Sequence, residues 1–245
     1  YMTYDKLVLQ SSQTTQKAAP TVRRSFELQP EKQIERARLH ATAAGIYNFY
    51  INGAPVSADY VNPGRTTLTK RVMYQTFDVT GMLKTGKNAM GAVLGKGWDN
   101  LEKISAGGKY ISLYAQLIVD YTDGTSETIV TDGDWKYSGN GPILQNDFWQ
   151  GETYDARREL GNWSSAEYND AAWKQAGVAA VRPIGGDQIV AQVGPTVTNT
   201  MTLSPITVSE PEEHVFVYDF GQNFAGTVRL RVKGTAGTKI RLRYA

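Results

Sequence analysis

Apolar and polar residues alternate with a period of two in many short runs from Thr21 onward, and these runs are rich in β-branched and aromatic residues. Because successive side chains of a strand point to opposite faces, such alternation is typical of strands with one buried face. No long stretch repeats its apolar residues at helical spacing. The pattern therefore predicts strands within residues 37–43, 46–53, 73–79, 89–95, 110–121 and 126–132.

Sharp turn signals close two of these runs. Asn52–Gly53 and Asp123–Gly124 supply the positive backbone angles that tight hairpins require. Short strands separated by frequent turns favour a β-sandwich over an α/β sheet. We therefore predict an all-β protein in which a jelly-roll-like β-sandwich is followed by part of a second β domain.

The same pattern divides the chain into three parts. Residues 1–20 are polar and without a period, and we interpret them as a lead-in segment with one short strand at Leu7–Leu9. The sandwich is predicted over residues 21–180. Residues 181–245 begin with Pro and Gly and continue with strand-like runs, which predicts a linker and the truncated start of the second domain. The last run, 238–245, alternates up to the final residue, and we expect the full-length protein to continue beyond it.

A segment rich in aromatic residues, 162–177, ends the predicted sandwich. Trp163 and Trp173 bracket a short predicted helical turn around Tyr168–Ala172. Because the segment is too short to fold alone, we expect both indole rings to be buried on the sandwich.

The composition narrows the classes of function. With 41% apolar and 20% charged residues, the chain can bury a core. A net charge of +2 with scattered Lys and Arg gives no argument for nucleic acid, and no apolar run is long enough for a membrane span. The lack of cysteine excludes thiolate chemistry, and only two histidines argue against a zinc site. The lack of cysteine fits every compartment, and we favour the periplasm or the exterior over the cytoplasm.

The first candidate for sugar chemistry is the stretch "LGKGWDN", residues 94–100. Its two glycines let a ligand approach the backbone. Trp98 offers an apolar face on which a sugar ring can stack, and Asp99 and Asn100 offer oxygens to hydroxyl groups or to a hard cation such as calcium. A loop with a buried Trp and a turn-forming Asp-Asn pair explains the same residues. Both interpretations stay open at this point.

The second candidate is "NDFWQGETYDARREL", residues 146–160. Two of its carboxylates, among Asp147, Glu152 and Asp155, could serve as a glycosidase acid and base, which stand about 5–9.5 Å apart. The stretch could also contact a sugar without cleaving it. The simplest interpretation is structural: Glu152 and Asp155 accept hydrogen bonds from the loop backbone, and Arg157 pairs with one of them. We favour the structural interpretation over catalysis.

A series of motifs then points to a family. The motifs are "YNFYING" at 47–53, "NPG" at 62–64, "YQTFDVT" at 74–80, "GKNA" at 86–89, "GKGW" at 95–98 and "GETYDAR" at 151–157. In this order and spacing they resemble the amino-terminal β-sandwich of bacterial α-L-rhamnosidases, glycoside hydrolase family 78. The stretch from Tyr218 to the end is similar to the start of the next β domain of that family, so the resemblance runs from about Thr21 to the last residue.

The resemblance implies a multidomain enzyme whose catalytic α/α-barrel follows these β domains and hydrolyses terminal α-L-rhamnose with inversion. This chain has no such helical region, so we expect it to hold no catalytic residues and to be inactive by itself. Some members of the family use the amino-terminal sandwich as a calcium-dependent rhamnose-binding module. By position, the resemblance implies Asp99, Asn100 and Asn146 as calcium ligands, with Trp98 and Glu152 beside them in the sugar-binding site.

Two alternatives to rhamnose binding stay open. The sandwich could be a structural accessory domain that braces the catalytic barrel and binds no sugar. The chain could instead be a complete small glycosidase that uses Asp147 and Glu152, but such an enzyme would not normally end inside a strand. The expected partners are therefore a rhamnose-containing carbohydrate and the catalytic domain of the same polypeptide, with calcium as the candidate cofactor.

Overall fold

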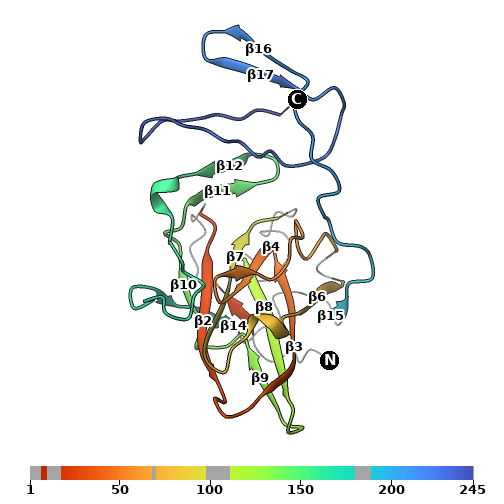
Figure 1. Cartoon of the computed structure of the whole chain (residues 1–245), viewed down its shortest axis with the longest axis vertical. Helices are drawn as coiled ribbons and strands as arrows, with labels where there is room; N and C mark the ends of the chain where they lie inside the picture. The colour runs from red at the N-terminus through yellow and green to blue at the C-terminus, as the bar shows by residue number, and fades with distance from the viewer. Residues whose placement is uncertain (1–6, 10–17, 68–69, 98–110, 180–188, 245) are drawn as a thin grey trace. The chain divides into compact units, whose positions relative to one another are not determined.

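The structure is a computed structural model that describes residues 7–9, 18–67, 70–97, 111–179 and 189–244. The chain divides into two compact units, Tyr1–Thr198 and Asn199–Ala245, and its strands are labelled in Figure 1. The first unit keeps residues 189–198, which the sequence pattern placed in the linker, because β15 (Ile189–Ala191) pairs with β6 (Val72–Asp78).

Two large sheets form the sandwich of the first unit. One sheet has the strand order β14 (Gly177–Ala179), β1 (Leu7–Leu9), β8 (Ser112–Tyr121), β3 (Ile34–Ala44), β6, β15, with β9 (Ser126–Val130) also paired to β8. The other has the order β13 (Lys174–Gln175), β10 (Lys136–Ser138), β2 (Thr21–Leu28), β7 (Gly86–Gly95), β4 (Ile46–Ile51), β5 (Ala54–Pro55). The β15–β6 pair is parallel, and the other pairs of the two sheets are antiparallel. The predicted all-β sandwich is confirmed.

The core lies between the inward faces of the two sheets. On β4, Tyr47, Phe49 and Ile51 are buried while Asn48 is exposed, as the period of two requires. The opposite sheet contributes alternate residues such as Leu39 of β3 to the same cluster. The alternation therefore located the core face of these strands correctly, together with the hairpin turn at Asn52–Gly53, whose φ angles are 49° and 88°.

The aromatic segment 162–177 differs from its prediction. Residues 163–173 form turns and no helix. Trp163 and Trp173 are half-buried rather than buried, and their rings stack on each other with centroids 6.4 Å apart. The segment lies on the outer face of the second sheet, where a Cβ atom on Gly91 would stand 2.7 Å from the Trp163 ring. One face of the aromatic pair packs against the sheet, so the other can remain in contact with solvent.

The hairpin β11 (Ile143–Asp147) and β12 (Gly151–Tyr154) forms a separate two-stranded sheet that follows β10. A 3₁₀ turn, Ala156–Arg158, comes directly after it, and another, Thr80–Met82, follows β6. Figure 1 shows the hairpin projecting beyond the ends of β7 and β4. This hairpin contains most of the second candidate stretch.

The second unit contains one hairpin, β16 (Thr207–Glu212) and β17 (Val215–Asp219), in its described residues. Gly221 donates its backbone N–H to Asp219 Oδ1 at 2.7 Å and closes the turn after β17. The last predicted run, 238–245, forms no strand in its described residues, 238–244. Apolar alternation gives a segment strand propensity, but a strand also needs a neighbour with which to pair.

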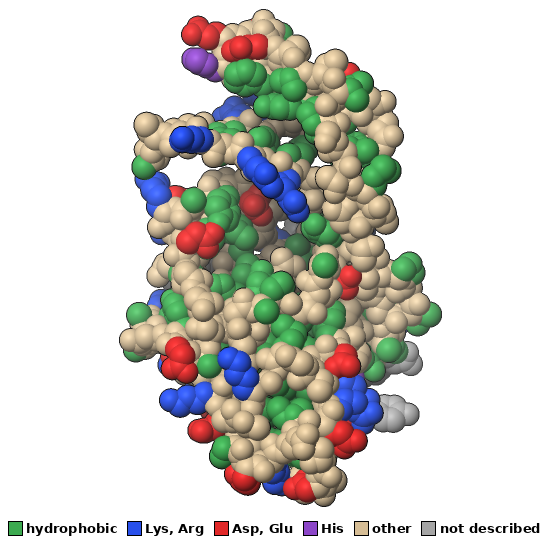
Figure 2. Space-filling model, viewed as in Figure 1, with side chains coloured by type: hydrophobic (Ala, Val, Ile, Leu, Met, Phe, Trp, Pro, Cys, Tyr) green, Lys and Arg blue, Asp and Glu red, His purple; other side chains and the backbone are tan. Residues whose placement is uncertain are grey.

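Positive and negative side chains are mixed on the visible face of the first unit, where Figure 2 shows Lys and Arg interspersed with Asp and Glu. Over the described ranges, no helix combines the length and the hydropathy that crossing a bilayer would take.

Candidate functional site

The β11–β12 hairpin brings two of the predicted site residues together. Asn146 and Glu152 are directly opposite each other in its antiparallel register. Directly opposite residues of an antiparallel pair share one face, with Cβ atoms about 4.5–5.5 Å apart. Surrounding atoms partly desolvate the Glu152 carboxyl, although its side chain reaches the surface, and this raises its pKa from the ordinary value. One face of the hairpin therefore presents an amide beside a carboxyl group.

Asn146 also joins this hairpin to the end of β7. The backbone N–H of Lys96 donates a hydrogen bond to Asn146 Oδ1 over 2.9 Å. Gly95 makes room for this contact, because a Cβ atom there would stand 3.3 Å from the same oxygen. Asn146 is thus fixed beside the loop that starts at Lys96, two residues before Trp98 in the sequence.

The other predicted site residues, Trp98, Asp99 and Asn100, lie outside the described residues. Their roles in sugar and calcium binding stay predictions. Within the described ranges, no three side chains of His, Cys, Asp or Glu gather closely enough to hold a metal ion.

Asp147 has a structural role in the hairpin. Its Oδ1 accepts hydrogen bonds from the backbone N–H groups of Trp149 at 2.8 Å and Gln150 at 3.0 Å, which closes the turn between the strands. Asp147 follows Asn146 directly in β11, so its side chain leaves the opposite face of the hairpin from Asn146 and Glu152. Two carboxyls on opposite faces of one ladder do not flank a common sugar bond, which argues against Asp147 and Glu152 as a catalytic pair.

Asp155 stabilises the turn that follows the hairpin. It accepts the backbone N–H of Arg157 at 3.1 Å and a bidentate pair from the Arg157 guanidinium, with Nε and Nη2 each 2.8 Å away. The side-chain hydrogen bonds from Arg157 lower the pKa of Asp155 to about 2. The expected pairing of Arg157 with one carboxylate of this stretch is therefore confirmed, and the partner is Asp155.

We expect Asp155→Asn to destabilise the first unit at neutral pH and to have little effect near pH 2. The pKa of this carboxyl is about 3.9 in an unfolded chain and about 2 in the folded one. A lowered folded pKa stabilises the fold above the unfolded value, and the contribution is lost as the pH falls through the folded value. The measurement is the denaturant midpoint of both proteins, followed by tryptophan fluorescence from pH 7 down to pH 2.

Arg157→Met should reproduce this pH dependence, because it removes the same hydrogen bonds from the other side. A difference between wild type and Asp155→Asn that is as large at pH 2 as at pH 7 would show that the ionised pair does not stabilise the fold.

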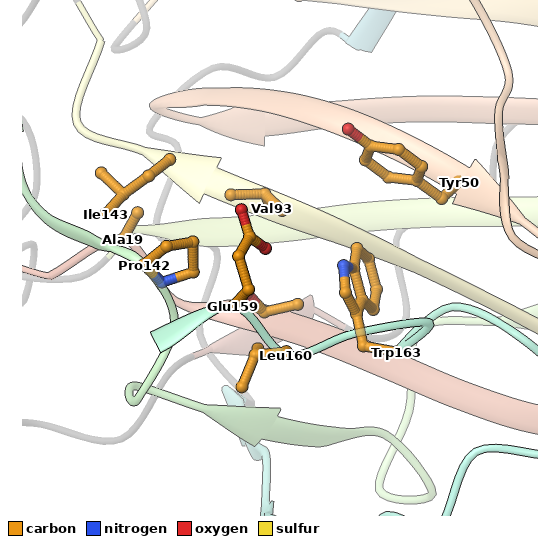
Figure 3. Close-up of a pocket in the computed structure, with 9 residues that line it drawn as sticks. Ala19, Tyr50, Val93, Pro142, Ile143, Glu159, Leu160 and Trp163 are labelled. Atoms are coloured by element: carbon orange, nitrogen blue, oxygen red, sulfur yellow. The ribbon is translucent and has the colours of Figure 1, made fainter. Parts of the chain in front are cut away.

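A small hollow on the outer face of the second sheet was not anticipated from the sequence. Its lining includes Tyr50 of β4, Val93 of β7, and Glu159 and Trp163 of the segment that returns from the hairpin (Figure 3). Tyr50 and Val93 lie in the runs 46–53 and 89–95 that were predicted as strands, and Trp163 was expected to be buried on the sandwich. No sequence pattern relates Glu159 to them, because their approach depends on the path of the chain after the hairpin.

Comparisons with known proteins agree on one family. Residues 32–201 match the family model described as the α-L-rhamnosidase N-terminal domain, and residues 209–245 match the bacterial α-L-rhamnosidase concanavalin-like domain. The chain is 46% identical over 235 residues to an α-L-rhamnosidase of Streptomyces avermitilis, and 31% identical over 242 residues to one of Alteromonas sp.. It covers only 22% and 26% of the lengths of these two relatives.

Solved structures give the same result. The crystal structure of the Streptomyces avermitilis α-L-rhamnosidase complexed with L-rhamnose matches with a TM-score of 0.76 and 43% identity, over 84% of this chain and 20% of that one. The α-L-rhamnosidase of Dictyoglumus thermophilum matches with a TM-score of 0.77 and 37% identity, over 84% of this chain and 22% of that one. Because the N-terminal domain model alone matches more than half of its residues, this chain belongs to the bacterial α-L-rhamnosidases, glycoside hydrolase family 78.

Proposed function

We propose that this chain is a non-catalytic part of a longer α-L-rhamnosidase that removes terminal α-L-rhamnose from glycosides, and that its first unit binds L-rhamnose with a calcium ion. The named relatives support the parent activity, and the chain spans about a quarter of their length or less. The turn-closing role of Asp147 and the ion pair of Asp155 support the absence of catalysis in the chain itself. Turnover of an aryl α-L-rhamnoside by the purified chain would contradict that part of the proposal.

The observation that carries the binding proposal is the fixed position of Asn146. Its amide oxygen is 2.9 Å from the backbone nitrogen of Lys96, which precedes Trp98, Asp99 and Asn100 by two to four residues in the sequence. This contact joins the hairpin to the end of β7, two segments that lie far apart in the sequence. The crystal structure of the Streptomyces avermitilis relative contains L-rhamnose, which makes this sugar the first ligand to test.

The donor set suits a hard cation. Calcium takes roughly 6–8 oxygen ligands, which include carboxylates, amide oxygens and hydroxyl groups. An amide oxygen carries two acceptor sites, so the hydrogen bond from Lys96 leaves one site of Asn146 Oδ1 for a cation. In this proposal Asp99, Asn100 and Asn146 hold the ion, which leaves positions for sugar hydroxyls. The ring of Trp98 and the side chain of Glu152 contact the sugar itself.

We expect calorimetric titration with L-rhamnose to give calcium-dependent binding in the high-micromolar to millimolar range, which corresponds to about 4–6 kcal/mol. A few hydroxyl–cation bonds and one stacked ring on an exposed site can supply this free energy. Addition of a chelator should remove the calcium-dependent component, and Asp99→Ala should abolish it because the variant lacks the charged ligand.

Two variants serve as controls for this titration. Lys239→Ala lies in the second unit, and Asp134→Ala removes a carboxylate from another exposed turn, where the Asp134 side chain is 74% exposed. Both should bind L-rhamnose as the wild type does. The titration should extend to about tens of millimolar rhamnose, well above the expected dissociation constant. The absence of calcium-dependent heat over this range would exclude the calcium site.

A bracing role is the second candidate function, and the surface of the hairpin favours it. Phe148, Trp149 and Tyr154 are exposed in 42%, 84% and 51% of their areas. Exposed apolar side chains that gather on one element often mark a contact with another protein surface. In the longer protein, the hairpin would contact the surface of the catalytic domain. A sandwich that binds no sugar, but whose Trp149→Ala variant weakens the stability of the full-length protein, would support this alternative.

A further inference from the structure

We propose that the hollow lined by Tyr50, Glu159 and Trp163 is a second sugar site, which binds one 6-deoxyhexose ring without calcium. The hollow has a volume of about 170 Å³. Pockets for drug-sized ligands measure roughly 300–1,000 Å³, so this one suits a single small ring. The chemistry of its walls argues for a sugar, whereas the choice of L-rhamnose as the probe rests on the proposed function.

Two aromatic rings form one corner of the hollow. The rings of Tyr50 and Trp163 are 5.3 Å apart between centroids and inclined at 70°. Trp163 is held by β7 on one side, where Gly91 has no side chain, and by stacking on Trp173. These two contacts restrict the orientation of the Trp163 ring before any ligand arrives. An aromatic face held in place in this way can receive the C–H face of a sugar ring at little cost in conformational entropy.

The exposed carboxylate of Glu159 faces this corner. Figure 3 shows the Glu159 carboxyl between the aromatic pair and the apolar residues of the opposite side. Among the residues that the structure describes, none donates a hydrogen bond to it. Burial raises the pKa of the Tyr50 hydroxyl, and the charge of Glu159 raises it further. The hollow thus offers a strong acceptor and a protonated phenol as a donor, which are the groups that sugar hydroxyls require.

The opposite side of the hollow is apolar. It consists of Ala19, Val93, Pro142, Ile143 and Leu160, and the remaining lining residue is Thr21. A hexose whose hydroxyl groups cover its whole rim would lose hydration against this wall without gaining partners. A 6-deoxyhexose carries a methyl group at C6, which can occupy the apolar side while the ring hydroxyls reach Glu159 and Tyr50. The lining therefore favours a 6-deoxy sugar over its 6-hydroxy counterpart.

The hollow lies near Asn146, the one proposed calcium ligand that the structure describes, and yet has separate chemistry. Val93 and Gly95 are two residues apart on β7, roughly 7 Å at the usual rise of a strand, and both face outward. Val93 lines the hollow, whereas Gly95 contacts Asn146. None of the residues that line the hollow is a proposed calcium ligand. Chelation therefore separates the two sites in an experiment.

The test is a titration of the whole chain with L-rhamnose in the presence of a chelator, followed by ¹H–¹⁵N NMR. We expect millimolar binding with shifts of the Trp163 indole and Glu159 amide signals. Glu159→Gln should weaken this binding by about tenfold or more, because a hydrogen bond to a charged group is replaced by a neutral one. Tyr50→Phe should weaken it as well, and L-mannose, which adds a C6 hydroxyl, should bind less tightly than L-rhamnose.

Glu167→Gln is the matched control, since it makes the same change at an exposed carboxylate outside the hollow, and it should leave the affinity unchanged. The absence of shifts at Trp163 and Glu159, or shifts that Glu159→Gln does not weaken, would overturn the proposal. Tighter binding of tetramethylammonium than of L-rhamnose would also overturn it, because two rings beside a carboxylate could instead serve a quaternary ammonium ion. Binding lost on chelation alone would support the calcium site and contradict this one.

Discussion

Replacing Trp135 by Ala is expected to lower the free energy of unfolding of the first unit by about 3–5 kcal/mol, the usual cost of removing a buried tryptophan ring. Trp135 is fully buried and stands first among the large buried side chains of the described core. It lies in the connection from β9 to β10, where the chain passes from one sheet to the other. Its ring therefore fills the space at the end of the sandwich that this crossing encloses.

Two contacts hold the ring in place. It meets Phe49 of β4 edge to face, with centroids 6.4 Å apart and planes inclined at 74°. Its Nε1–H donates to the carbonyl oxygen of Val130, the last residue of β9, at 3.0 Å. The Ala variant would lose the packing of the ring and leave a cavity, while the Val130 carbonyl would keep its hydrogen bond from Arg24 Nη1 at 2.9 Å.

Thermal unfolding followed by tryptophan fluorescence can measure the effect. All five tryptophans precede Thr198, so each single variant keeps four reporters in the first unit. A loss of 3–5 kcal/mol corresponds to a decrease in Tm of roughly 6–20 °C for a unit of this size. The control is Trp149→Ala, which removes a ring that is 84% exposed and should change stability by about 0.5 kcal/mol or less. Equal shifts in the two variants would show that the Trp135 ring does not support the core.

Trp135 also shows where sequence reasoning ends. The strands of the sandwich were predictable because period-two alternation records which side of each strand meets the core. Trp135 stands in "TDGDWKYSG", among turn residues with no alternation. Its burial results from the crossing between sheets, which is a property of the topology. Trp163 and Trp173 were expected to be buried on the sandwich, yet they remain half-buried on its outer face.

The candidate site was predictable only in part, for a similar reason. The motifs indicated Asn146 and Glu152 as members of one site, and the hairpin register places them opposite each other. The motifs did not indicate which face of the hairpin Asp147 would occupy. A shift of the strand pairing by one residue exchanges the two faces, and the motifs do not fix this register. The hollow was missed altogether, since Tyr50, Glu159 and Trp163 meet only after the chain returns from the hairpin.

The second large effect is expected for Asp170→Asn, which should lower the free energy of unfolding of the first unit by about 2–4 kcal/mol. Asp170 lies in the aromatic segment and pairs with Arg23 of β2, whose side chain is 0% exposed. Burial lowers the pKa of Arg23, which means that its charge has lost much of its hydration. The carboxylate also accepts a hydrogen bond from Lys136 Nζ at 2.6 Å. The variant would leave both cations without their counter-ion.

Other contacts of Arg23 limit the expected loss. Its Nη2 donates to the carbonyl oxygen of Ser165 at 3.0 Å, and its guanidinium carbon lies 5.5 Å from the centroid of the Tyr168 ring. Asp170 itself is 18% exposed, so water can partly replace its carboxylate. These contacts should keep the effect below the roughly 5 kcal/mol that mark the upper end for broken buried pairs.

A neighbouring ion pair provides the matched control. Arg24 Nη2 pairs with Asp134 at 3.0 Å, but the Asp134 side chain is 74% exposed, and exposed pairs contribute about 0–1 kcal/mol. Urea unfolding followed by tryptophan fluorescence should therefore separate Asp170→Asn from Asp134→Asn by at least about 1 kcal/mol. The double variant Arg23→Met/Asp170→Asn should recover part of the loss, because it removes the buried charge together with its partner. If Asp170→Asn is as mild as Asp134→Asn, the aromatic segment is held on the sheet by its stacked rings alone, and the Arg23–Asp170 pair adds nothing to them.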